Sequence, residues 1–435
     1  MLSNCGAQSA LQSYQSLDIS LVSATCCFMS TYLGAQAIGC LIFPPYTETY
    51  GRKTTYIASS LLYAVSIIVV GTPGNLPSII LGRVLSGFVS TIPSVCTAGS
   101  IEEIWSPHER IWAVQAWVTV ALLGIAVAPA TALAIGSDLG WRWVYRLGAS
   151  VVGLNTVLFF FTLESRPSRI LFNITESLKK KHAIEDISIE NVEYVPDLRT
   201  FVRNSLAKPS KMFFTEPIVF AVTVMGSTVY ASAYLLTELI PGIYRGFGFT
   251  LRQGGLVFLA FALGGITFPI LTRLHDSSIG KRLARQQRAL VPEDKLLGFL
   301  IASPVQAISI WWFAWTIPPY LKHSPLISIA ALVPLGFAFN EFDYVLVGYL
   351  CDTYTTDAGS ANAPMGFIRA TLIAVYPLFG PAIFKGLGNN FAASILAAVA
   401  TLYCLIAFGF WKYGAKLRKR SLWARQNQRR EQSTE

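Results

Sequence analysis

Apolar runs of about 20 residues recur along the 435-residue chain, and each is long enough to cross the hydrocarbon core of a bilayer as one α-helix. We predict eleven such spans, at residues 19–43, 55–71, 78–98, 111–136, 143–163, 217–240, 251–271, 296–317, 325–349, 363–384 and 391–411. Charged residues make up only 13% of the chain, too few to cover the surface of a soluble protein of this length. The sequence therefore predicts an all-α polytopic membrane protein whose main partner is the lipid bilayer.

The basic residues gather on one predicted side of that bilayer. If the loops near residues 48, 105, 190, 285 and 355 and the C-terminal tail share one side, that side holds 26 of the 34 Lys and Arg residues. Such an excess is typical of the cytosolic side, so we expect these loops and the C-terminus to be cytosolic. The net charge of +10 then faces anionic lipid, and we expect no nucleic-acid partner.

The longest polar interruption divides the spans into two groups. We expect an N-terminal bundle at residues 1–163 with five spans, a cytosolic linker at 164–216, a C-terminal bundle at 217–411 with six spans, and a basic cytosolic tail at 412–435. The linker is interpreted either as a solvated connection or as amphipathic, basic pieces lying along the cytosolic face.

The two groups of spans repeat one charged pattern weakly. A span in the first group ends in "FPPYTETYGRK", and a span in the second ends in "GGITFPILTRLHDSSIGKR". The residues that recur are Glu48, Gly51, Arg52 and Lys53 in the first, and Asp276, Gly280, Lys281 and Arg282 in the second. Internal repeats of this kind are typical of secondary transporters, whose substrate site lies between the halves.

These motifs, taken in order, indicate a family. "YGRK", "LGRVLSGF", "GIAVAPATALAIG", "GWRWVYRL", "LESRPSRIL", "YLCDTYTTDAGSA" and "YPLFGPAIFKGLG" follow one another along the chain. Over residues 20–425 it resembles the twelve-span drug:proton antiporters of the major facilitator superfamily, in their fungal branch. The resemblance implies a fold of two pseudo-symmetric helical bundles and transport by alternating access.

The resemblance also implies roles for individual residues. The first charged turn and its counterpart at Asp276, Lys281 and Arg282 match a cytosolic gate, which latches when that side closes. A turn that ends a helix and follows the positive-inside rule is the alternative. Arg83 matches a cation in the proton pathway, although an arginine that extends to the outer membrane interface is the alternative. Gly124 and Pro129 match a kinked antiporter motif in the fifth family span.

Three departures from the family pattern stand out. Pro44 occupies the position where the loop motif usually begins with Gly. The Gly-Pro pair of the antiporter motif is Ala128-Pro129, and its trailing Gly-Gly pair is absent. Residues 1–18 resemble the outer loop between the first two family spans, so we expect eleven spans, a missing first span and an external N-terminus.

Charged residues inside predicted spans are candidates for proton coupling, because a charge in the bilayer interior costs several kcal/mol. Glu341 and Asp343 lie two residues apart, on opposed sides of one helix, so at least one should face a cavity or a partner such as Arg369. A desolvated carboxylate there could take up and release protons. A structural ion pair is the alternative.

Tyr230, Tyr234 and Glu238 recur at intervals of four residues, which places them on one face of a helix. An aromatic wall that ends in a carboxylate suits an organic cation or a hydrophobic molecule with a polar head. The sequence therefore predicts a substrate pocket here, with ordinary helix packing as the alternative.

The composition and motifs together favour a proton-coupled exporter of small organic molecules, working as a monomer in the cell membrane or the vacuolar membrane. An ATP-driven pump is disfavoured because the chain has no Gly-x-x-x-x-Gly-Lys-Ser/Thr loop. The four His are scattered, so we expect no metal site, no cofactor and no enzyme activity. The alternatives are an importer of polyamines or nutrients and a non-transporting or sensor-like relative.

Overall fold

The structure is a computed structural model of the chain. It describes all residues except 1, 15–16, 73–74, 107–108, 183–199, 201–202, 286–291, 321–323, 355–357, 422 and 426–435. The side chains of residues 2–4, 44–49, 95–96, 98–99, 102–103, 180–182, 204–205 and 283–285 are not described either.

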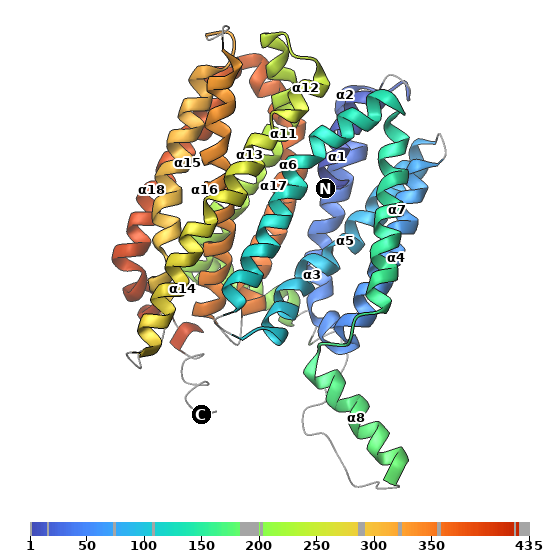
Figure 1. The fold of residues 1–435 in the computed structure, drawn as a ribbon, viewed down its shortest axis with the longest axis vertical. Coiled ribbons are helices and arrows are strands. Elements are labelled where there is room, and N and C mark those ends of the chain that lie inside the picture. Colours follow the sequence, from blue (N-terminus) through green and yellow to red (C-terminus); the bar gives the residue numbers. More distant parts are fainter. Residues whose placement is uncertain are drawn as a thin grey trace.

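The described residues fold into helices joined by short connections (Figure 1). The long helices are α3 (Thr31–Tyr50), α4 (Arg52–Gly71), α5 (Leu76–Ile104), α6 (Arg110–Asp138), α7 (Trp141–Phe160), α11 (Pro217–Ile243), α14 (Pro269–Arg285), α15 (Leu297–Thr316), α16 (Pro325–Thr353), α17 (Ala358–Leu387) and α18 (Asn389–Arg420). The shorter ones are α1 (Leu2–Ser13), α2 (Leu21–Thr25), α8 (Pro167–His182), α10 (Lys208–Thr215), α12 (Leu251–Leu256), α13 (Leu259–Thr267), the π-helices η1 (Cys26–Ser30) and η2 (Arg203–Ala207), and the 3₁₀ helices η3 (Tyr244–Phe247) and η4 (Pro292–Lys295).

Eleven segments of the described chain are long and apolar enough to cross a membrane, as predicted. They begin and end within a few residues of the predicted spans at most edges. The sixth and the eleventh continue, to Phe247 and Arg420, past the expected ends at residues 240 and 411. The largest exception is the seventh, which continues as helix α14 well past the expected end at residue 271. Asp276, Lys281 and Arg282 therefore lie on a helix and not in a connecting turn.

The described part of residues 1–18 does not form the outer loop that the sequence predicts. Residues 2–13 form helix α1, which packs against α2, η1, α6, α7 and α11, and its first turn lies about half way along the bundle (Figure 1). Cys5, Gln8, Ser9 and Ala10 are all nearly inaccessible to solvent. This segment contains small and uncharged side chains, which can approach neighbouring helices closely, and this explains why a weakly apolar sequence is buried.

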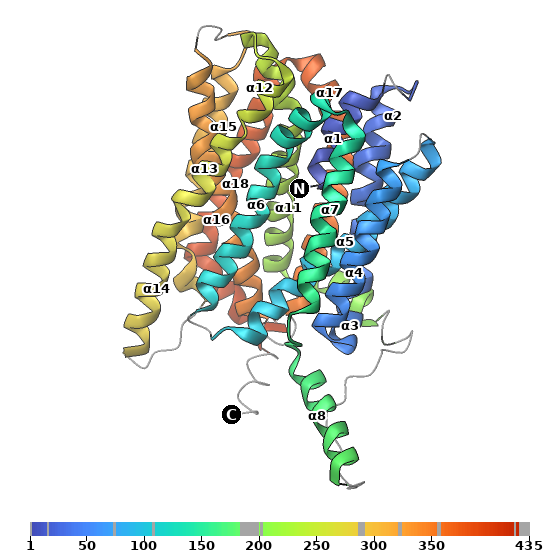
Figure 2. The ribbon, with the colours of Figure 1, turned by 45° about the vertical axis from the view of Figure 1, so that its right-hand side comes forward.

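The helices form two groups that contact each other along two seams. Helices α3, α4, α5 and α7 pack together, with α6 against α5 and α7. Helices α11, α13, α15, α16, α17 and α18 form the second group, with α12 against α11. The seams are α3 against α17, and α6 against α12 and α13 (Figures 1 and 2). We call the end of the bundle that carries Gly51, α8 and the end of α18 the basic end.

The second seam depends on adjacent glycines in α12. A Cβ on Gly254 would lie 2.9 Å from the Cα of Pro241, and one on Gly255 would lie 3.1 Å from the carbonyl oxygen of Pro129. Both positions therefore need glycine, which has no Cβ, because α12 packs closely against Pro241 of α11 and Pro129 of α6. The predicted kink at Gly124 and Pro129 stays a prediction, although Pro129 does lie inside α6 at this seam.

Candidate functional site

An ion pair of α16 and α17 joins two of the predicted proton-coupling residues. A guanidinium nitrogen of Arg369 lies 2.8 Å from the Asp343 carboxylate, whose other oxygen accepts a hydrogen bond of 3.0 Å from the Tyr230 hydroxyl. The guanidinium also stacks 3.8 Å above the Tyr230 ring. Tyr230, which the sequence assigned to the substrate pocket, thus belongs to the same cluster as Asp343 and Arg369. We call these three residues the Asp343 site.

The Asp343 site lies close to the seam between the two groups of helices. A Cβ on Gly366, one turn before Arg369 on α17, would lie 3.5 Å from the Cys40 sulfur of α3. Asp343 is only 7% exposed, so its charge depends on the Arg369 and Tyr230 contacts for stabilisation. A change in the charge of Asp343 would therefore act on α17 where it meets α3.

Glu341 points the other way, as expected from the two-residue spacing, and its partner is Arg273 of α14. The closest oxygen and nitrogen are 2.5 Å apart, and both side chains are fully buried. Thr272 donates a second hydrogen bond of 2.5 Å to Glu341, and Tyr344 stacks under the guanidinium at 3.5 Å. The sequence analysis did not predict a role for Arg273, although this residue lies within the repeated charged pattern that ends in Lys281 and Arg282.

Asp276, predicted as part of a cytosolic gate, is buried beside Arg273. Its carboxylate lies 3.3 Å from the Arg273 guanidinium, and its side chain is 4% exposed. Lys281 and Arg282, predicted as its companions, are exposed further along α14. The structure therefore separates these three residues, because α14 remains helical and turns Lys281 and Arg282 toward solvent.

The first predicted gate turn consists of one residue, Gly51, between α3 and α4. Gly51 has φ +86°, a conformation that side chains other than glycine rarely adopt. The Glu164 carboxylate accepts hydrogen bonds from the backbone N–H groups of Arg52 (2.8 Å) and Lys53 (3.2 Å). Glu164 thus satisfies free N–H groups at the start of α4, where a negative charge is favoured. The side chain of Glu48 lies outside the described residues.

Arg83 is only 1% exposed, so its side chain lies among the helices and not on the surface of the bundle. Its Nε donates a hydrogen bond of 2.6 Å to the carbonyl oxygen of Phe28, and its guanidinium lies 4.4 Å from the Tyr32 ring centroid. The backbone of Gly6 in α1 packs directly against it. Arg83 therefore holds η1 and α1 together, and its role in a proton pathway stays a prediction.

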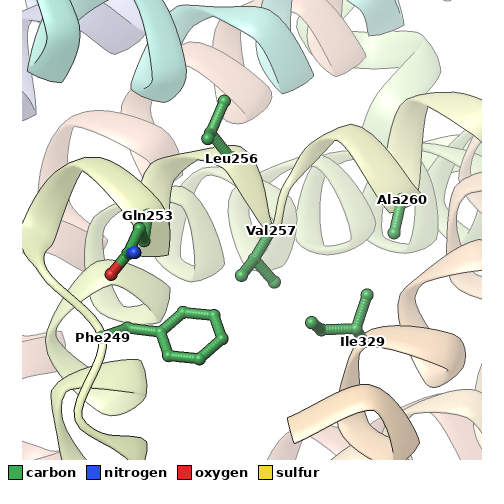
Figure 3. A pocket seen from close by; sticks show the side chains of 6 residues that line it. All are labelled: Phe249, Gln253, Leu256, Val257, Ala260 and Ile329. Carbon is green, nitrogen blue, oxygen red and sulfur yellow. The ribbon is translucent and has the colours of Figure 1, made fainter.

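Tyr234 and Glu238 lie on α11, on the same face as Tyr230. Tyr234 is partly buried and packs against the main core, and one carboxylate oxygen of Glu238 is buried with no hydrogen-bond partner among the described residues. A cavity of about 310 Å³ lies elsewhere, near the break between α12 and α13, and none of the predicted site residues lines it (Figure 3). The predicted substrate pocket therefore stays a prediction.

Polar side chains link the two groups of helices. Gln115 of α6 donates a hydrogen bond of 2.8 Å to Asn340 of α16, and Gln8 of α1 donates one of 3.0 Å to the carbonyl oxygen of Thr237 on α11. Neither amide was predicted from the sequence, because an uncharged side chain in a long helix gives no signal of its partner. Asn340 directly precedes Glu341, so adjacent residues of α16 contact Gln115 of α6 and Arg273 of α14.

Comparison with known proteins agrees with this architecture. The chain is 28% identical over 403 residues to the multidrug transporter TPO1_2 of Candida glabrata, covering 91% of this chain and 69% of that protein. It is 27% identical over 405 residues to the efflux pump FUBT of Fusarium oxysporum, covering 91% and 67%. The multidrug transporter FLU1 of Candida albicans is 28% identical over 408 residues, covering 91% and 65%.

Solved structures share the fold. A D-xylose-proton symporter superimposes with a TM-score of 0.63 at 14% identity, covering 94% of this chain and 95% of that one. The proton:xylose symporter XylE gives a TM-score of 0.62 at 15% identity, covering 94% and 93%. Residues 6–377 match the sequence family described as Major Facilitator Superfamily. The chain is therefore a multi-pass membrane transporter that belongs to the major facilitator superfamily.

Proposed function

We propose that this transporter exports small organic molecules by alternating access and that proton binding at the Asp343 site drives the cycle. The cargo class is drugs, toxins or secondary metabolites, because the similar fungal proteins are named multidrug transporters and efflux pumps. The observation that carries the coupling is the buried contact of Asp343 with Arg369 and Tyr230.

The Asp343 site has the parts that proton coupling needs. A proton on Asp343 removes the negative charge that faces Arg369, so the ion pair between α16 and α17 weakens. Arg369 keeps its charge and its stacking on Tyr230. Because α17 meets α3 one turn away, protonation would favour a different arrangement of the two groups of helices.

Tyr234 and Glu238 supply the cargo site in this proposal. An aromatic ring and a carboxylate on one face of α11 offer stacking and a counter-charge to an organic cation. At the basic end, Gly51, Arg52 and Lys53 act as the cytosolic latch, with Glu164 as the group that engages it. The protein would work as a monomer in the cell membrane, with the C-terminus in the cytosol.

The test uses purified protein in liposomes with an acidic interior. Ethidium, spermidine and D-xylose are offered outside, and accumulation is followed with and without nigericin, which collapses the proton gradient. We expect ethidium to accumulate only with the gradient. We expect Asp343→Asn to lose accumulation while it retains exchange of ethidium across the membrane at equal pH.

Asp138→Asn is the matched control, because Asp138 forms an exposed ion pair with Arg252. An exposed pair contributes about 0–1 kcal/mol, so accumulation should persist in this variant. Movement of cargo with the proton gradient instead of against it would favour an importer. The absence of both accumulation and exchange for every probe would favour a non-transporting relative.

A further inference from the structure

The second buried charge cluster has more carboxylates than cations. Arg273, Glu341 and Asp276 lie together between α14 and α16, and all three side chains are at most 4% exposed. If both carboxylates were ionised, the cluster would carry one uncompensated negative charge. An uncompensated charge away from water costs several kcal/mol, so one carboxylate should hold a proton.

The hydrogen bonds indicate which carboxylate that is. Glu341 accepts hydrogen bonds from both Thr272 and Arg273, at 2.5 Å each. Asp276 contacts Arg273 at 3.3 Å, but neither of its oxygens accepts a hydrogen bond from the described residues. Hydrogen bonds favour the ionised form of a carboxylate, so Glu341 is the ionised member.

The other charged groups nearby do not supply the missing positive charge. The Lys295 Nζ forms an ion pair of 2.6 Å with an Asp352 carboxylate oxygen, and the Tyr344 ring stacks under Arg273. His275 lies 3.8 Å from Asp276 but is 43% exposed, so water can stabilise either of its forms. Arg110 begins α6, which also packs against α14, and it has contacts of its own.

The cluster is also closed to a larger ligand. A Cβ on Gly298 of α15 would collide with the Glu341 carboxylate and lie 3.2 Å from the Arg273 guanidinium. The backbone of α15 therefore covers the pair on that side. The ligand that fits is a proton, which needs no cavity.

We propose that Asp276 is a second proton-binding carboxylate, separate from the Asp343 site. A proton from water at the basic end forms an O–H bond on Asp276, beside the exposed His275, and leaves Arg273 and Glu341 as a neutral pair. This deepens the proposed function by adding a second site at which protons bind. The test below does not depend on transport, so it can fail without affecting the Asp343 proposal.

Infrared spectroscopy of the purified protein in lipid nanodiscs measures protonated carboxyl groups directly, through their C=O stretching band at neutral pH. We expect Asp276→Asn to lose one carboxyl group of band intensity relative to the unmodified protein. We also expect Glu341→Gln to lose the same amount, because Asp276 then becomes the sole counter-ion of Arg273 and ionises. A substitution at Glu341 removes a proton from Asp276 only if the two carboxylates share the single positive charge of Arg273. This result would therefore distinguish the proposal from a purely structural role of Asp276.

Asp138→Asn is the control, since it removes a carboxylate of the exposed pair with Arg252 and should leave the band unchanged. His275→Gln should also leave it unchanged. Circular dichroism and a single elution peak establish that each variant is folded, and Asp276→Glu should restore the band if Asp276→Asn is unstable. An unchanged band in both Asp276→Asn and Glu341→Gln overturns the proposal. Loss of proton-driven accumulation in Asp343→Asn alongside that result would leave the proposed function intact.

Discussion

The hydroxyl of Tyr230 and the carboxylate of Asp343 are 3.0 Å apart, which joins a residue predicted to bind cargo to one predicted to bind protons. Tyr230→Phe separates the two roles, because it removes the hydroxyl and keeps the ring that contacts the Arg369 guanidinium and the Phe339 ring. A hydrogen bond to a charged group contributes about 1.5–3 kcal/mol, so we expect proton-driven ethidium accumulation to slow by roughly tenfold or more. The half-saturation concentration for ethidium exchange should stay the same. A raised half-saturation concentration with normal coupling would place Tyr230 in the cargo site.

Glu164 and the turn at Gly51 give a prediction about the basic end. Glu164→Ala removes the acceptor for the N–H groups of Arg52 and Lys53, and loss of a helix N-terminal cap costs about 0.5–2 kcal/mol. We expect a lower thermal unfolding midpoint and slower transport, with Glu164→Gln closer to the unmodified protein because its amide oxygen can still accept. An equal loss in both variants would show that the negative charge matters more than the hydrogen bonds.

Two glycines of α16 provide a matched pair. A Cβ on Gly336 would collide with the carbonyl oxygen of Phe261, whereas a Cβ on Gly348 would meet no atom within 4 Å. Gly336→Ala should therefore lower the yield of folded protein and its thermal midpoint, since an overpacked core costs about 1–3 kcal/mol. Gly348→Ala should be neutral or stabilising by up to about 1 kcal/mol, because alanine favours helices. Equal effects would contradict the close packing of α13 on α16.

Tyr354 and Glu216 connect the ends of α16 and α11 just beyond the spans. The Tyr354 hydroxyl donates a hydrogen bond of 3.0 Å to Glu216, and burial, with the added effect of the Glu216 charge, raises the pKa of Tyr354. The folded protein therefore favours the protonated phenol. This stabilisation is complete below the ordinary pKa of tyrosine and is lost progressively as the pH rises above it.

Tyr354→Phe tests this contact. It leaves the buried Glu216 carboxylate without the hydroxyl, so the thermal midpoint at neutral pH should fall, by an amount equivalent to about 1–3 kcal/mol. Its midpoint should also decrease less than that of the unmodified protein when the pH is raised toward about 11, beyond the ordinary tyrosine pKa. Parallel decreases in both proteins would show that Tyr354 does not contribute to alkaline unfolding.

The hydrogen bond from Gln115 to Asn340 crosses between the two groups of helices, so it should influence which arrangement the transporter adopts. Asn340→Ala removes it together with the bond to the Gly265 carbonyl. We expect a redistribution of distances between spin labels placed on α6 and α16, with a faster exchange between arrangements. Gln306→Ala is a suitable control, because Gln306 is a buried amide on α15, away from α6. Unchanged distances in Asn340→Ala would contradict a linking role.

The eleven spans could be predicted from the sequence because bilayer thickness sets the length of an apolar helix. Helix α1 could not, since its Ser, Gln and Ala residues carry no strong apolar signal and its burial depends on α6 and α7. The opposed directions of Glu341 and Asp343 follow from helical geometry. The identity of the partner of Glu341 could not be predicted, because only the folded structure places Arg273 of α14 beside it. The capping role of Glu164 was not predicted for the same reason, since the helix that it caps begins 112 residues earlier in the chain.

Within one turn of α16, Asn340 contacts α6, Glu341 contacts α14, and Asp343 contacts α17. Inserting or deleting a single residue just before this turn would rotate all three side chains by about 100° around the helix axis. No neighbouring helix could follow such a rotation, so all three contacts would be lost at once. The length of α16 up to Asn340 is therefore constrained more tightly than the identity of most of its residues.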